Sequence, residues 1–108
     1  MKRNVNEGKV ERYVTKGVQE QVPLDVQLFL WHEYDKCTQM DECDYLHVFK
    51  LKGIIEDVDG FNLVVVHEQE VPEYHRAYVL NTVHQIKSLK VYIIDDQTHQ
   101  TMLLTEEY

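Results

Sequence analysis

A series of strand-like segments after residue 44 constrains the fold of this chain more than any other feature. Each segment alternates apolar and polar side chains or is rich in β-branched and aromatic residues, as a half-buried strand requires. The segments cover residues 45–52, 61–70, 73–80, 89–95 and 101–105. The links between them are short, whereas a parallel pair of consecutive strands needs a crossover of about a dozen residues or more. We therefore expect an antiparallel sheet, with a hairpin at Asp59-Gly60 and a break at Pro72.

One helix is predicted before these strands, over residues 24–40. Pro23 suits a first helical turn, Asp25 lies where the helix dipole favours a carboxylate, and no helix breaker follows until past residue 40. A short first strand is predicted at residues 10–18, which are rich in β-branched and aromatic side chains. This order predicts an α+β fold in which one main helix packs on an antiparallel sheet of five or six strands.

The chain has 108 residues, so we expect a single domain over residues 10–108 behind a flexible leader at residues 1–9. No apolar run is long enough for a membrane helix, and the polar start does not resemble a signal peptide. Two cysteines are too few for a secreted domain of this size, which favours a cytoplasmic location. The net charge of −8 repels a phosphate backbone, so we expect no direct binding to nucleic acid.

Cysteines and histidines are the residues best suited to bind a metal. Cys37 and Cys43 can supply two zinc ligands, with histidines completing a tetrahedral site. Their spacing is unusual for such a site, so we expect two reduced thiols, no metal and no cofactor, with Cys37 buried as a small hydrophobe. His47, His67 and His75 fall on three successive predicted strands, and they share a face only if the strand registers match.

A second candidate site is the loop that carries Asp95, Asp96 and His99. Two carboxylates and an imidazole can hold a divalent cation, although aspartates also cap turns through their own backbone. We expect a turn here. The sequence lacks a Gly-rich phosphate loop and the G-x-S-x-G, H-E-x-x-H and C-x-x-C motifs, so we predict no catalytic residue and no small-molecule substrate.

The predicted helix carries two apolar stripes instead of one. The broad stripe contains Val26, Phe29, Leu30, Cys37 and Met40. The second stripe contains Leu24, Leu28 and Trp31, and it is either covered by the sheet or the N-terminal segment, or open as a partner surface. We predict that these three residues bind a protein partner or a second copy of the chain.

Six segments together resemble one known family. They are YVTKGV at residues 13–18, PLDVQLFLW at 23–31, DYLHVF at 44–49, QEVPEY at 69–74, YIIDD at 92–96 and MLLTEEY at 102–108. In this order they are similar to a bacterial and phage family, domain-of-unknown-function family 960. The resemblance implies a small stand-alone cytoplasmic protein of low-GC Gram-positive bacteria or their phages. It implies no activity and no site residue.

These observations favour a non-enzymatic, small cytoplasmic protein that interacts or regulates through protein–protein contacts. The first alternative is an acidic, phage-type inhibitor that mimics nucleic acid by presenting carboxylates in place of phosphates. The second alternative is a small metal-dependent enzyme that uses the Asp95-Asp96-His99 loop.

Overall fold

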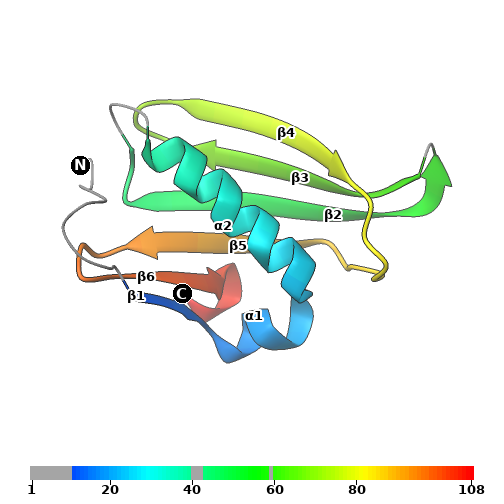
Figure 1. The fold of residues 1–108 in the computed structure, drawn as a ribbon, viewed down its shortest axis with the longest axis horizontal. Coiled ribbons are helices and arrows are strands. Elements are labelled where there is room, and N and C mark those ends of the chain that lie inside the picture. Colours follow the sequence, from blue (N-terminus) through cyan, green and yellow to red (C-terminus); the bar gives the residue numbers. More distant parts are fainter. Residues whose placement is uncertain (1–10, 40–42, 59) are drawn as a thin grey trace.

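The computed structural model describes residues 11–39, 43–58 and 60–108, whose arrangement is shown in Figure 1. In chain order the elements are β1 (Glu11–Val14), α1 (Lys16–Gln21), α2 (Leu24–Thr38), β2 (Leu46–Val58), β3 (Phe61–Gln69), β4 (Tyr74–Leu80), β5 (Leu89–Asp95), β6 (His99–Leu104) and the short 3-10 helix η1 (Thr105–Glu107). The main helix and the five later strands lie where they were predicted, although β2 continues past residue 52. The α+β class is therefore confirmed. The leader predicted at residues 1–9 lies outside the described residues.

The six strands form one sheet in the order β1-β6-β5-β2-β3-β4. All neighbouring pairs are antiparallel except β1 and β6, which run parallel. The sheet is thus mixed, and the expectation of a wholly antiparallel sheet was wrong at this edge. Short links exclude parallel pairing only between consecutive strands. β1 and β6 are separated by both helices and all the other strands, so their connection is long enough for either direction.

The first strand, predicted over residues 10–18, is β1 at Glu11–Val14 in the described residues and ends at Val14, so the prediction extended too far toward the C-terminus. The strand ends where Thr15 caps α1, because its Oγ1 accepts a hydrogen bond from the Val18 N–H at 3.3 Å. Val18 and Val22, four residues apart, are both buried in the core. Their burial on one side of this turn of helix outweighs the strand propensity of the segment.

α2 crosses one face of the sheet, and the hydrophobic core lies between the two layers (Figure 1). The core contains Val18, Val22, Val26, Leu30, Tyr34, Phe49, Leu51, Leu63, Val65, Ile86, Val91, Ile93, Met102 and Leu104. Alternate residues of β2, β3, β5 and β6 point into it, as Leu63 and Val65 do in β3, while Val64 and Val66 face the other side of the sheet. Within the described part of the chain, neither α1 nor α2 covers that other face.

The two predicted turn residues, Gly60 and Pro72, lie between strands. Gly60 comes directly before β3 with a φ of 81°, in the left-handed region that favours glycine, while its predicted turn partner Asp59 lies outside the described residues. Pro72 lies between β3 and β4. None of the helices in the described ranges is long and apolar enough to span a membrane.

Candidate functional site

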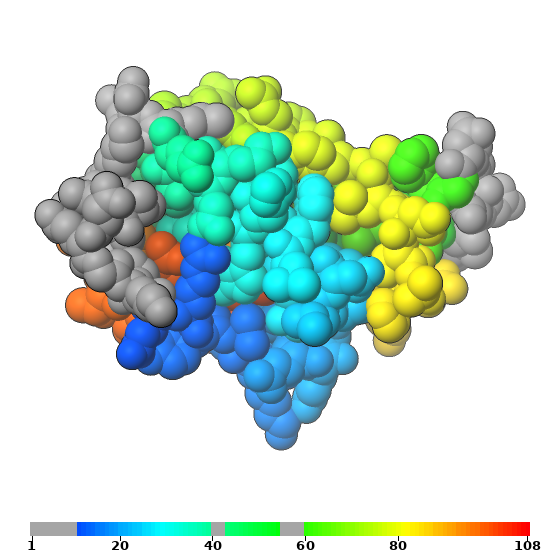
Figure 2. All heavy atoms as spheres, in the orientation of Figure 1, coloured from blue at the N-terminus to red at the C-terminus, as the bar shows by residue number. Residues whose placement is uncertain are grey.

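The predicted partner surface on α2 is open along two of its three residues. Leu24 is 67% exposed and Leu28 is 60% exposed. Trp31 is half-buried, because the guanidinium of Arg12 from β1 lies 4.5 Å from the centre of its ring and Tyr34 packs edge-on against it. We call Leu24, Leu28 and Trp31 the α2 ridge. Figure 2 shows α2 along the front surface of the molecule, with β1 beside its C-terminal half.

The broad stripe of α2 faces the sheet. Val26, Leu30 and Cys37 are buried, and Phe29 is partly buried against Tyr78 of β4. Met40, the last predicted member, lies outside the described residues, and α2 ends at Thr38.

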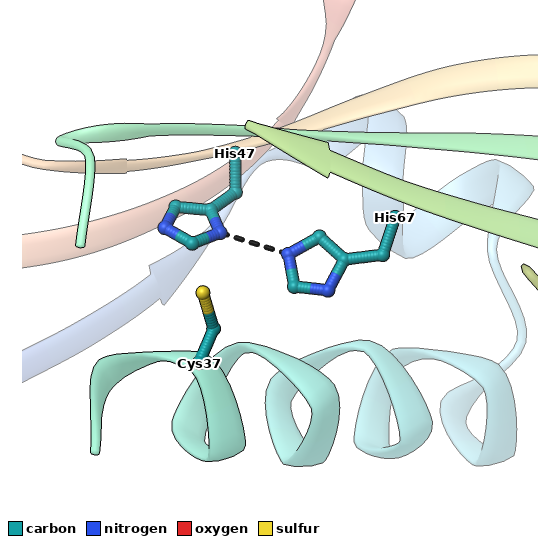
Figure 3. A group of neighbouring side chains, drawn as sticks. All are labelled: Cys37, His47 and His67. Atoms are coloured by element: carbon teal, nitrogen blue, oxygen red, sulfur yellow. Dashed lines mark hydrogen bonds between the residues drawn. The ribbon is translucent and has the colours of Figure 1, made fainter. Parts of the chain in front are cut away.

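A buried cluster of thiols and imidazoles lies under the C-terminal end of α2. Cys37 comes from α2, Cys43 from the loop that follows, His47 from β2 and His67 from β3. His47 Nδ1 lies 2.8 Å from His67 Nε2, and Cys43 Sγ lies 3.0 Å from His47 Nε2. Figure 3 shows the two rings pointing toward one another above the Cys37 thiol. One donor atom from each of Cys37, His47 and His67 lies within 4.8 Å of the other two.

The third histidine of the predicted group is not part of this cluster. His75 pairs in register with Glu68, whose side chain faces the far side of the sheet from the core. There His75 Nε2 lies 3.8 Å from a Glu68 carboxylate oxygen. Strand register therefore brings two of the three predicted histidines together and excludes the third.

Burial keeps the His67 ring uncharged at neutral pH. It lowers the pKa of His67 to about 3, with the neighbouring His47 and Lys36 acting in the same direction. A hydrogen bond between the two thiols lowers the pKa of Cys37 and raises that of Cys43, and burial raises the pKa of Cys43 further. Cys43 therefore holds its proton, whereas a cysteine nucleophile must be a thiolate.

A pocket of about 360 Å³ opens beside the cluster and includes Cys43 in its wall. Tyr34 and Asp95 also line it, and the Tyr34 hydroxyl donates a hydrogen bond to Asp95 Oδ2 at 3.3 Å. Burial, followed by the negative charge of Asp95, raises the pKa of Tyr34 well above its ordinary value. The pocket provides a path from solvent to the edge of the thiol cluster.

The Asp95-Asp96-His99 loop closes the turn between β5 and β6. Asp96 Oδ1 accepts hydrogen bonds from the backbone N–H groups of Thr98 at 2.9 Å and His99 at 2.8 Å. Asp95 Oδ1 accepts another from the Gln97 N–H at 2.7 Å, and His99 Nε2 lies 3.0 Å from Asp96 Oδ2. The backbone hydrogen bond from His99 is the main reason that the pKa of Asp96 is lowered. The carboxylate oxygens considered as cation ligands are thus used by the turn.

The convergence of cysteines and histidines was not predicted, although part of its signal is in the sequence. His47 has the same strand parity as Phe49, and His67 has the same parity as Leu63 and Val65. Alternation alone therefore assigns both histidines to the core side of the sheet. Their distance from each other and from Cys37 depends on the β2–β3 register and on where α2 crosses the sheet.

Comparison with known proteins identifies relatives without an assigned activity. A model of the family described as staphylococcal proteins of unknown function, DUF960, matches residues 11–107. A crystal structure of a protein of unknown function from Enterococcus faecalis is similar, with a TM-score of 0.74 and 22% sequence identity over 92% of this chain and 91% of that one. At this identity the similarity shows a shared fold. No curated protein matches the chain.

Proposed function

The chain belongs to the family of staphylococcal proteins of unknown function, DUF960, and we propose that it is a cytoplasmic, non-enzymatic protein that acts through protein–protein contacts. The observation that carries this proposal is the exposure of Leu24 and Leu28, one turn apart on α2. Full burial of one leucine side chain contributes about 1.5 to 3 kcal/mol of free energy. A partner that covers the ridge gains much of this free energy from each of the two leucines.

The chemistry of the nearby groups supports a protein without catalytic activity. Cys43 is the cysteine that reaches the pocket, and its raised pKa keeps it in the unreactive thiol form. Asp95 and Asp96 are held in the β5–β6 turn by hydrogen bonds to the backbone. The pocket thiol is thus held in its protonated form, and the carboxylates of the β5–β6 turn are occupied by structural contacts.

We assign the ridge to a second copy of the chain, related by a two-fold axis that passes near Leu28. Leu28 lies midway between Asp25 and Trp31, three residues from each. Antiparallel helices crossing at Leu28 bring the Trp31 end of one ridge, with Arg12 above it, against the Asp25 end of the other. This pairing brings Arg12, which also forms an ion pair with Asp35 of its own chain, toward the Asp25 carboxylate of the other copy at both ends of an apolar centre, and it sets the two helix dipoles antiparallel.

Sedimentation equilibrium over a wide protein concentration range tests this assignment. We expect the wild type to dimerise and Leu28→Asp to be monomeric with a nearly unchanged melting temperature, because a residue that is 60% exposed adds little to the core. Val79→Asp is the matched control. Val79 is an exposed apolar side chain on the opposite face of the sheet, with 51% exposure, so this variant should dimerise like the wild type.

A wild type that stays monomeric at the highest concentration would overturn the assignment to a second copy. Equal loss of dimer in Leu28→Asp and Val79→Asp would show that added negative charge, and not the ridge, controls association. Unfolding of Leu28→Asp would place the side chain in the core and remove the basis of the proposal.

A further inference from the structure

The buried cluster under α2 contains two thiols and two imidazoles, a donor set that binds Zn²⁺ in tetrahedral protein sites. We propose that Cys37, Cys43, His47 and His67 form a zinc site. This proposal reverses the expectation from spacing alone that the two cysteines bind no metal. It goes beyond the proposed interaction function and is independent of it.

The distances between the donor atoms are close to those of a metal site. Tetrahedral zinc, with bonds of about 2.0 to 2.3 Å, holds its donors about 3.3 to 3.8 Å apart. His47 Nδ1 and His67 Nε2 are 2.8 Å apart, and Cys37 Sγ completes a triad within 4.8 Å. Small movements of a few tenths of an ångström to about one ångström therefore place three donors around one ion. Cys43 becomes the fourth by rotating its side chain, since its thiol already hydrogen-bonds to Cys37.

The tautomer of His47 suits a ligand. Its Nε2 lies 3.1 Å from the carbonyl oxygen of Asp44, which can only accept a hydrogen bond. With its proton on Nε2, the ring donates to this carbonyl, and Nδ1 presents its lone pair toward His67 and Cys37. A metal-binding histidine commonly donates its other N–H to a backbone carbonyl in this way, which fixes the ring.

Burying the imidazole of His67 as an ordinary core side chain costs folding free energy. It is fully buried, and in the described part of the protein its Nδ1 has no hydrogen-bond partner. A phenylalanine of similar size would incur no such penalty, and Phe49 stacks on the His67 ring with centres 4.3 Å apart. Metal binding through Nε2 would explain why a histidine occupies this buried position.

Charge and protons balance when the ion binds. The thiols of Cys37 and Cys43 each lose one proton to solvent, and the two thiolates neutralise Zn²⁺. His47 keeps its proton on Nε2. His67 moves its single proton from Nε2 to Nδ1, which frees Nε2 for the metal. The filled site has no net charge, which avoids the cost of burying an uncompensated charge. The pocket beside Cys43 provides the entry path.

The test uses the full chain without a histidine tag, kept in a reductant that does not bind metals. We expect equimolar zinc to survive dialysis and the melting temperature to fall when a chelator removes it. Co²⁺ added to the metal-free protein should give the strong visible bands of a tetrahedral site and a thiolate-to-cobalt charge-transfer band in the near ultraviolet. Cys37→Ser should lose part of this charge-transfer intensity, because only the Cys43 thiolate remains, and it should no longer retain equimolar zinc through dialysis.

His75→Gln is the matched control, because His75 lies on the same sheet but faces away from the cluster, and it should bind zinc like the wild type. The Co²⁺ spectra of the wild-type protein test the zinc site even if Cys37→Ser does not fold. Fully reduced wild type with no tetrahedral Co²⁺ bands and an unchanged melting temperature in Zn²⁺ would overturn the proposal. Leu28→Asp should retain the zinc. The zinc measurement can therefore be interpreted even if the protein does not dimerise.

Discussion

Replacing Gly53 with alanine should destabilise the fold strongly, because the chain passes over β2 at this point. A Cβ atom built on Gly53 would lie 1.9 Å from the carbonyl oxygen of Ile86, in the segment between β4 and β5. Real Cβ contacts are essentially never below 3.0 Å, so the two backbones would have to separate by more than an ångström. Ile86 is itself part of the buried core and cannot move away freely.

The expected loss of stability follows from the clash of the new Cβ atom with a backbone carbonyl. Overpacking a core costs about 1 to 3 kcal/mol, and a backbone carbonyl gives way less easily than a side chain, which places Gly53→Ala near 3 kcal/mol. Alanine regains about 0.5 to 1 kcal/mol because it loses less backbone entropy than glycine on folding. The net loss of about 2 kcal/mol corresponds to a fall of about 8 to 16 °C in melting temperature for a domain of this size.

Thermal and urea denaturation of Gly53→Ala and Gly60→Ala measure this difference. Gly60 is the control, because nothing lies within 4 Å of its added Cβ and only its φ of 81° opposes alanine. That conformation costs a non-glycine residue about 1 kcal/mol. If Gly53→Ala melts at or above the temperature of Gly60→Ala, the segment containing Ile86 does not cross β2 in the manner described.

Two further predictions concern contacts of the β1–α1 segment with η1 and with α2. Glu107→Gln should be destabilised at neutral pH, because the Glu107 carboxylate accepts hydrogen bonds from Thr15 Oγ1 at 2.6 Å and from the Gly17 N–H at 3.1 Å. These bonds lower the pKa of Glu107, so its contribution is present above the ordinary glutamate pKa and is lost as the pH falls through the lowered value. Urea denaturation over a pH series should show the two proteins converge in acid, and a constant difference would contradict this. Arg12→Ala should cost about 1 kcal/mol and shift the emission of Trp31, the only tryptophan, to longer wavelength by uncovering its ring. An unchanged emission spectrum would show that Arg12 does not shield Trp31.

The individual elements of the fold could be predicted from the sequence. α2 and the strands after it follow from helical and strand periodicity, from Pro23 and Asp25 at the helix start, and from Gly60 and Pro72 between strands. These signals act between residues that are neighbours in the chain. The same reasoning failed at α1, where Thr15 offers a cap but the helix is stabilised by core contacts of Val18 that periodicity over so short a segment does not reveal.

Contacts between distant segments were decided only in the tertiary structure. The sequence by itself determined that His47 and His67 lie on the core side of their strands, because side chains alternate along a strand. Their approach to Cys37 required the β2–β3 register and the crossing of α2. Helical geometry likewise placed the ridge residues on one side of α2, but the docking of β1 decided which of them is covered. Local geometry is set by adjacent backbone units, whereas strand pairing and helix docking depend on the simultaneous packing of the whole core.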